Sequence, residues 1–222
     1  IRELKLYGCV MKGFQKQVYD MMERGDDPRE RTKFGNFNMK GIQTSIIVYP
    51  KLTDSNNNSD FIIDQHIGDV GFDSIVKKSR KYSLKDSFKG FFNVDNLDNY
   101  SCKISQFIKN ITDSEGIIFV YSKYIKSGIL PLALALEYNG YQKYDGSLIA
   151  EKVDSIGKYI ILSGDEELSP KNTYKNYLNI QKDNKNGEKV KIIIGTETAA
   201  EGLDFKYIRQ VHSLDPWFHL NK

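Results

Sequence analysis

The amino-acid sequence predicts an α/β fold in its second half, with a parallel sheet that is covered by helices on both faces. Three continuous apolar runs of strand length support this prediction: Ile117–Tyr121, Tyr159–Leu162 and Val190–Ile194. Such runs are typical of strands that are buried on both faces. Helical patterns separate the runs, and strands that alternate with helices indicate a parallel sheet.

Spacing and capping residues predict the remaining elements of this half. Ser101 is suited to cap a helix whose apolar face consists of Ile104, Phe107, Ile108 and Ile111. A second helix is predicted around Leu130–Tyr138, where Pro131 is tolerated because it lies in the first turn. A third helix is predicted with one face made of Tyr174, Tyr177 and Leu178. Gln210–Leu214 is a weaker fourth strand.

The first hundred residues predict a less regular α+β segment. A helix is expected over residues 10–24, with an apolar face of Met11, Phe14, Val18, Met21 and Met22 and a polar face that includes Gln15. Ile46–Pro50 resembles a short strand, and the polar, turn-rich residues Asp54–Asp60 indicate a mobile loop. We therefore expect a lead-in segment over residues 1–95 and an α/β domain over residues 96–222.

Residues 77–89 form a basic stretch with six cations, two aromatic rings and a single opposing carboxylate, Asp86. Two interpretations fit this pattern. Lysines interleaved with aromatic side chains can follow a phosphate backbone and stack on bases. Charge runs are more commonly solvated or disordered linkers.

Composition sets broad limits on function. The net charge is +3, from 32 basic and 29 acidic residues, so net charge alone does not indicate a nucleic-acid partner. No apolar run approaches the roughly 18 residues that would cross a bilayer, and the charged start is unlike a signal peptide. Because the chain starts at Ile1 rather than Met, we expect a piece of a longer protein. Two distant cysteines, Cys9 and Cys102, favour a reducing compartment and no zinc site.

The histidines and the single tryptophan are expected to have structural roles. His66 is predicted on the surface and His212 within a strand, because neither has a partner nucleophile or metal-ligand set in the sequence. Trp217 follows Pro216 and is interpreted as a packing anchor. We therefore predict no catalytic residue and no metal ligand in this chain.

Chemistry is expected in the loops that follow the strands, because ligands of open parallel sheets bind at the carboxyl ends of the strands. These loops are Tyr121–Lys123, Ser163–Asp165 and Gly195–Phe205. The last combines glycines, threonine hydroxyls and the carboxylates of Glu201 and Asp204. The residues alone fit either a nucleotide or sugar-phosphate site or a tight, capped strand-to-helix turn.

The run Ile192–Phe205 resembles motif V of superfamily-two helicases, and the continuation Ile208–Asn221 narrows the resemblance. The sequence of these residues is similar to that of the NTPases of large cytoplasmic DNA viruses, namely the poxvirus nucleoside triphosphatase I and early transcription factor group and their mimivirus relatives. Gly13–Tyr19 resembles the lead-in to the second motor domain of such proteins. The resemblance is detailed over roughly residues 101–218 and implies a RecA-like helicase C-terminal domain.

The resemblance also implies site residues. It assigns contacts with the nucleic-acid strand to Ser122, Lys123, Ser163, Gly164 and Thr196. It assigns the edge of the ATP cleft to Glu201, Gly202 and Asp204. The implied partners are DNA or RNA, an N-terminal RecA-like lobe and a viral RNA polymerase, in the cytoplasmic factory or the virion of a large DNA virus, with no membrane partner.

Several family features are absent from the sequence. There is no G-x-x-x-x-G-K-[ST] phosphate loop. Asp165–Leu168 is not a Walker B box, because Ser163 and Gly164 separate the acidic residues from the strand. The arginines of motif VI would follow Asn221, and Arg209 is poorly placed to act as an arginine finger. We therefore expect ATP and Mg²⁺ to be used by the whole protein and not held by this chain alone, which should not hydrolyse ATP.

Two other functions are compatible with the fold. The chain could be a non-catalytic RecA-like module that docks onto a viral transcription complex through its Tyr- and Phe-rich first hundred residues. It could also be a small-molecule enzyme on a doubly wound sheet, since fold alone does not fix function. An intact phosphate loop in the whole gene would argue against the first, and nucleotide binding by the isolated chain would support the second.

Overall fold

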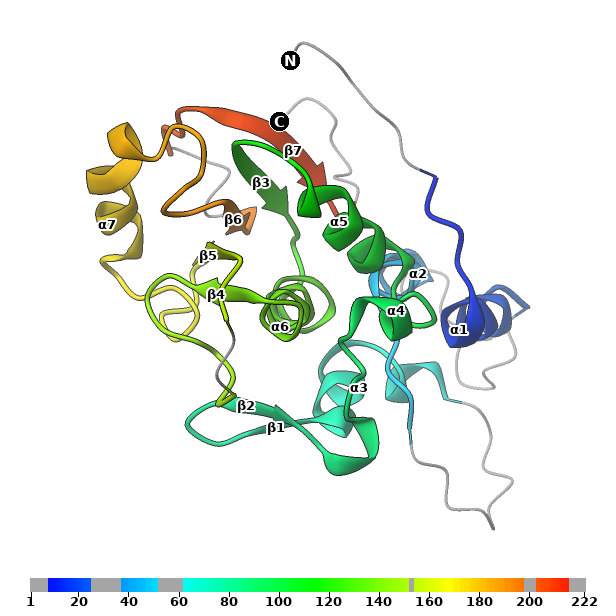
Figure 1. Cartoon of the computed structure of the whole chain (residues 1–222). Helices are drawn as coiled ribbons and strands as arrows, with labels where there is room; N and C mark the ends of the chain where they lie inside the picture. Colours follow the sequence, from blue (N-terminus) through cyan, green and yellow to red (C-terminus); the bar gives the residue numbers. More distant parts are fainter. Residues whose placement is uncertain (1–7, 25–36, 52–61, 152–153, 198–202, 216–222) are drawn as a thin grey trace.

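A five-stranded parallel sheet forms the centre of the computed structural model, which describes residues 8–24, 37–51, 62–151, 154–197 and 203–215. The strand order is β4-β5-β6-β3-β7 (Figure 1). The strands are β3 (Ile117–Tyr121), β4 (Tyr141–Lys143), β5 (Gly157–Leu162), β6 (Ile192–Gly195) and β7 (Ile208–Ser213). The predicted α/β class is confirmed, and the arrangement is RecA-like. The sequence pattern does not reveal β4, because three residues with one ring carry almost no strand signal.

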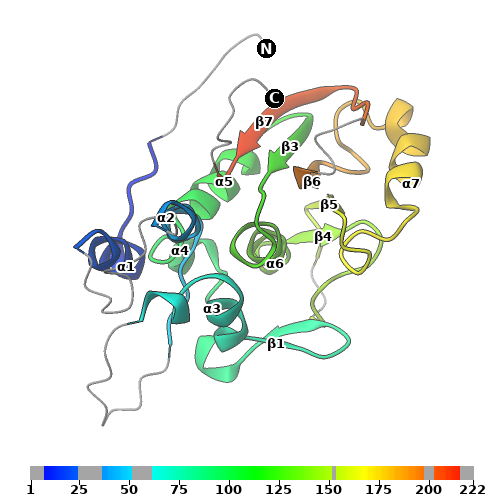
Figure 2. The same cartoon turned by 180° about the vertical axis from the view of Figure 1, so that it is seen from behind.

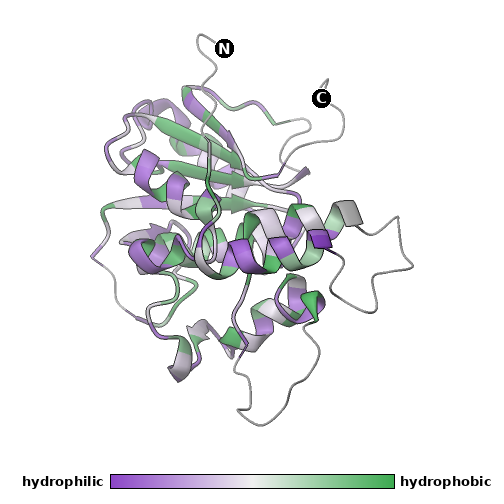
Figure 3. Ribbon diagram, turned by 90° about the vertical axis from the view of Figure 1, so that its right-hand side faces the viewer, coloured by the Kyte–Doolittle hydropathy of each residue, from purple (hydrophilic) through white to green (hydrophobic). Residues whose placement is uncertain are grey.

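Helices cover both faces of the sheet. These helices are α5 (Cys102–Thr112), α6 (Leu130–Tyr138) and α7 (Thr173–Ile180). Ile118 and Val120 of β3 belong to a buried cluster with Phe107 of α5 and Leu134 of α6. Ile117, on the other face of the same strand, belongs to a cluster with Tyr177 of α7. Burial on both faces explains why the central strands are continuously apolar, as the hydropathy colours of Figure 3 show.

The capping and spacing predictions for these helices are largely confirmed. The Ser101 hydroxyl accepts a hydrogen bond from the amide of Ile104 at 3.1 Å, so Ser101 caps α5. Pro131 lies in the first turn of α6, after a π-helical turn, η3 (Ile125–Ile129). The prediction for Leu178 is wrong, because this side chain of α7 is 39% exposed.

The segment before the sheet holds more regular structure than its sequence indicates. It contains α1 (Gly13–Arg24), α2 (Phe37–Ile46), α3 (Gly68–Ile75), α4 (Val94–Leu97), the 3-10 turns η1 (Ile63–Gln65) and η2 (Asp86–Phe88), and an antiparallel hairpin of β1 (Val76–Lys78) and β2 (Tyr82–Leu84). A further 3-10 turn, η4 (Gln181–Asp183), follows α7. From behind, α1 and α2 lie beside α4 and α5 (Figure 2). The helix predicted over residues 10–24 is confirmed from Gly13 to Arg24, and the Asp54–Asp60 prediction lies outside the described residues.

Three expectations for this segment are wrong. Ile46 ends α2 instead of opening a strand, and Val48 belongs to neither sheet although its amide bonds to the carbonyl of Tyr100 at 2.9 Å. His66 is buried rather than on the surface, with its Nδ1 2.9 Å from the carbonyl oxygen of Tyr49. Gln15 is fully buried, because its side-chain amide bonds to the backbone of α2 and of α5.

The lead-in segment and the sheet share one apolar core. A single buried cluster includes Ile47, Phe72 and Phe92 from the segment as well as Ile104 and Ile118 from the α/β part. The predicted boundary at residue 95, between the lead-in segment and the α/β domain, therefore remains a prediction from the sequence. Among the described residues, no helix is long and apolar enough to cross a membrane.

Candidate nucleic-acid interface

The carboxyl ends of the central strands meet at one edge of the sheet. Tyr121 of β3 is in register with Gly195 of β6 and Ser213 of β7, and Leu162 of β5 is in register with Gly195. The chain continues this register past the strand ends, because the amide of Thr196 donates to the carbonyl of Leu162 at 3.1 Å. The structure thus brings together the loops that begin at Ser122, Ser163 and Thr196.

Ser122 faces the interior at this edge. Its side chain is 0% exposed, and its hydroxyl accepts a hydrogen bond from the amide of Tyr124 at 3.3 Å. A Cβ atom on Gly128 would lie 2.0 Å from the same hydroxyl, so glycine is required there for the π-helical turn to pack on the loop. The hydroxyl that the resemblance assigns to a phosphate is therefore turned away from solvent in this conformation and supports the loop instead.

Lys123 is the exposed cation of the same loop. Its backbone amide donates to both carboxylate oxygens of Asp215, at 3.2 and 3.0 Å, and Asp215 lies two residues after the end of β7. Asp215 is only 3% exposed, and burial raises the pKa of its carboxyl group. Burial also lowers the pKa of Lys103, whose ammonium donates a hydrogen bond to the carbonyl of Leu214 at 2.7 Å. Asp215 therefore fixes the backbone that carries Lys123.

Asp215 supports the candidate interface, and the sequence does not reveal it. Its signal is weak, since a single Asp before a Pro is ordinarily a turn residue. Only the strand order, which places β7 next to β3, brings its carboxylate to the Lys123 amide.

Ser163 and Gly164 form an open turn after β5, in which Gly164 is exposed and Ser163 is partly exposed. The amide of Asp165 donates to the Ser163 hydroxyl at 3.3 Å. The Asp165 carboxylate in turn accepts from the amides of Glu167 and Leu168, at 2.9 and 3.3 Å. Asp165 thus caps a local turn, and this position differs from that of a metal-binding Asp directly after a strand.

The motif V loop is described at its two ends. Thr196 is 8% exposed beside β5. Glu201 and Gly202 lie outside the described residues, as does Thr198. The chain returns over the α7 face, where the Phe205 ring packs 5.6 Å from that of Phe119. The amide of Asp204 donates to the Tyr174 hydroxyl at 3.2 Å, while its carboxylate is exposed to solvent.

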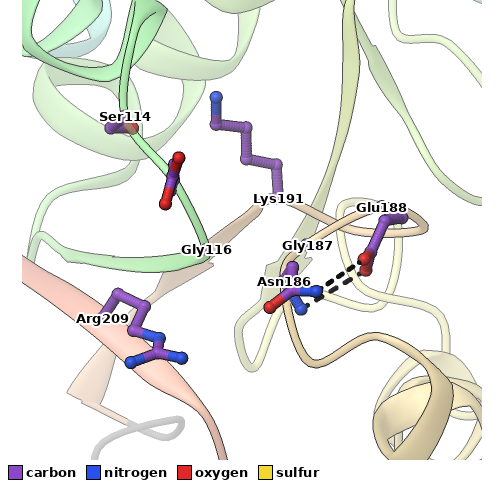
Figure 4. Close-up of a pocket in the computed structure, with 8 residues that line it drawn as sticks. Ser114, Gly116, Asn186, Gly187, Glu188, Lys191 and Arg209 are labelled. Carbon is purple, nitrogen blue, oxygen red and sulfur yellow. Dashed lines mark hydrogen bonds between the residues drawn. The ribbon is translucent and has the colours of Figure 1, made fainter.

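The opposite, amino-terminal edge of the sheet has a separate cavity of about 720 Å³. Arg209 lies within β7, near its start, and borders this cavity together with Lys191 and Gly116 (Figure 4). The last strand, predicted over Gln210–Leu214, therefore begins two residues earlier, at Ile208, and includes Arg209. Since it lies at the start of β7 and Thr196 follows the end of β6, a strand length separates Arg209 from the candidate interface.

The chain has relatives among proteins of large DNA viruses. "Putative ATP-dependent RNA helicase R563" of Acanthamoeba polyphaga mimivirus is 25% identical over 228 residues, which cover 99% of this chain and 34% of the relative. "Termination factor NPH-I homolog" of African swine fever virus is 30% identical over 150 residues, which cover 54% of this chain and 21% of the relative.

The chain thus spans about a third or less of the length of these curated relatives. No protein-family model matches it. The relatives and the RecA-like sheet agree with the resemblance carried by residues 192–221. The chain is thus similar to putative ATP-dependent RNA helicases of mimivirus and to NPH-I homologues of African swine fever virus, which is consistent with a viral superfamily-two helicase or NPH-I-like family.

Proposed function

We propose that this chain is the C-terminal motor lobe of a nucleic-acid-dependent ATPase of the helicase type. The observation that carries the proposal is the meeting of the Ser122, Ser163 and Thr196 loops at the carboxyl edge of one parallel sheet. The names of the relatives, an RNA helicase and NPH-I homologues, support it. In the whole protein, this lobe would close against an N-terminal RecA-like lobe and move along a strand.

The roles of the edge residues follow from their exposure. Lys123 supplies a positive charge to a phosphate, and the open backbone and hydroxyl at Ser163 and Gly164 supply hydrogen bonds to neighbouring phosphates. Thr196 is only 8% exposed, so at the start of the motif V loop it would border this row of contacts rather than lead it. Because the Ser122 hydroxyl is buried, its role is to hold the Lys123 loop in place.

The donor set of the described residues does not favour ATP phosphates. Asp204 presents an exposed carboxylate, which suits a ribose hydroxyl or an arginine of the other lobe better than a phosphate. Glu201, Gly202 and Asp204 would therefore border a cleft whose phosphate-binding groups belong to the N-terminal lobe. Mg²⁺ would supply charge neutralisation for phosphoryl transfer in the assembled protein. We further propose a viral RNA polymerase as a partner, because the African swine fever virus relatives are named as termination-factor homologues.

The isolated chain is expected to bind single-stranded nucleic acid weakly, without sequence preference and with strong salt dependence. The reason is that phosphate contacts release counterions, so the affinity falls as salt rises. Fluorescence anisotropy with labelled oligothymidylate and oligouridylate, measured over a range of salt concentrations, checks this. The same affinity at every salt concentration, or no binding at the lowest one, would contradict the proposed function.

A further inference from the structure

The basic stretch of the sequence forms an ordered, exposed hairpin beside the candidate interface. Five consecutive residues, 77–81, are exposed, and four of them are cations: Lys77, Lys78, Arg80 and Lys81. They lie on β1 and in the turn that joins β1 to β2. The disordered-linker interpretation is therefore wrong for this part of the stretch, and the cations are presented on a fixed backbone.

Several contacts hold the hairpin against the α/β part. The Tyr82 side chain is buried, and its amide donates to the carbonyl of Leu148 at 2.8 Å. Tyr82 also forms a parallel bridge with Ile149, whose carbonyl accepts from the Lys81 ammonium at 3.2 Å. Because Lys81 lies in the turn and Tyr82 directly follows it, these contacts hold the turn end of the hairpin against residues 148 and 149.

The hairpin adjoins the turn after β5. The Lys78 ammonium forms an ion pair with Glu167, three residues after Gly164, and this contact raises the pKa of Lys78. A cavity of about 170 Å³ joins the two surfaces, and it is lined by Lys78 and Tyr82 of the hairpin and by Lys126, Asp165 and Leu168 of the sheet loops. In Figure 1, the hairpin lies on the side of the sheet toward which β3 points, which is the carboxyl side.

The acidic groups near this surface are largely paired. Glu167 is paired with Lys78, Glu166 with Lys171 at 3.1 Å, and Asp73 with Lys126 at 2.8 Å. Among the described residues, Lys77 and Arg80 form no ion pair. After these pairings, two cations of the hairpin, Lys77 on β1 and Arg80 in the turn, remain available to a phosphate backbone.

We infer that the β1–β2 hairpin is a second contact surface for the nucleic-acid strand, next to the Ser163–Gly164 turn. This inference rests on the proposed function and extends it, since it assigns phosphate contacts to Lys77 and Arg80. The chemistry recognised is the phosphodiester backbone that DNA and RNA share. The hairpin would lengthen the track beyond the sheet edge, and the contacts of Lys81 and Tyr82 with residues 148 and 149 fix it in position.

The test is the affinity of the chain for labelled oligothymidylate and oligouridylate over a range of salt concentrations. The variant is K77E/R80E, and the matched control is K175E/K182E, which reverses two exposed lysines at α7 and η4. The hairpin variant should bind roughly tenfold more weakly, and the slope of log affinity against log salt should fall by about 1 for each lost phosphate contact. The charge-preserving variant K77R/R80K should bind as the wild type does.

The outcomes separate this inference from the proposed function. If the wild type binds and K123E weakens binding, but K77E/R80E behaves like K175E/K182E, then the hairpin inference is overturned while the edge interface stands. If the wild type does not bind at low salt, both fail together. A loss with only one of the two oligonucleotides supports the inference and identifies the strand. Melting curves of each variant show whether the change lies in folding.

Discussion

Replacing Glu137 by alanine is expected to destabilise the chain by roughly 3–5 kcal/mol, because it removes a buried acceptor that several donors share. Glu137 lies in α6 and is 0% exposed. Its carboxylate accepts from the amides of Leu148 and Ile149, at 2.9 and 2.8 Å, and from the Tyr159 hydroxyl at 2.9 Å. With alanine, these donors would remain buried without acceptors. Urea unfolding measures this loss of unfolding free energy, which is obtained from the transition midpoint and the slope of free energy against urea concentration.

Two variants calibrate that experiment. E137Q keeps one acceptor oxygen but turns an amide toward a donor, so its loss should be smaller, about 1–3 kcal/mol. E115A removes an exposed carboxylate of the same protein and should stay within about 0.5 kcal/mol of the wild type. A value for E137A as small as that for E115A would show that Glu137 does not hold the 143–149 segment.

The second large effect is expected at Lys123. In the whole protein, K123E should raise the nucleic-acid concentration for half-maximal ATPase stimulation by roughly tenfold to a hundredfold. A charge-assisted hydrogen bond contributes about 1.5–3 kcal/mol, and each 1.4 kcal/mol corresponds to a factor of ten. ATP hydrolysis is measured against increasing single-stranded oligonucleotide. The matched variant K175E, at an exposed lysine of α7, should follow the wild-type curve, and an identical curve for K123E would remove Lys123 from the interface.

The central sheet could be predicted because its signal is local. Ile117–Tyr121 and Tyr159–Leu162 are apolar without interruption, and a strand buried on both faces needs that pattern. The Ser101 cap followed the same logic, since its hydroxyl acts within one helical turn. By contrast, the hairpin was missed because Lys77 and Lys81 dominate its composition, and its stability comes from a distant contact of Tyr82 with Leu148.

The position of the candidate loops could be predicted from the sequence, whereas the contacts that hold their residues in place could not. Sequence order places Ser122, Ser163 and Thr196 after strands, and a parallel sheet then brings them to one edge. The burial of the Ser122 hydroxyl depends on Gly128, and the support of Lys123 depends on Asp215. Both partners are set by packing between elements, so hydropathy along the chain carries no sign of them. Gln15 was placed on the wrong helix face for the same reason, because its acceptors lie in α2.

Hydrogen exchange of backbone amides, with and without a saturating single-stranded oligonucleotide, tests the central claim most directly. The account predicts added protection in peptides covering residues 121–126 and 162–168, at the carboxyl edge of the sheet, and in peptides that begin at Gly195, where β6 ends. Peptides covering residues 114–117 and 186–191, which border the amino-terminal cavity with Arg209, should exchange unchanged. Protection confined to this cavity, with none at the strand-end loops, would contradict the account.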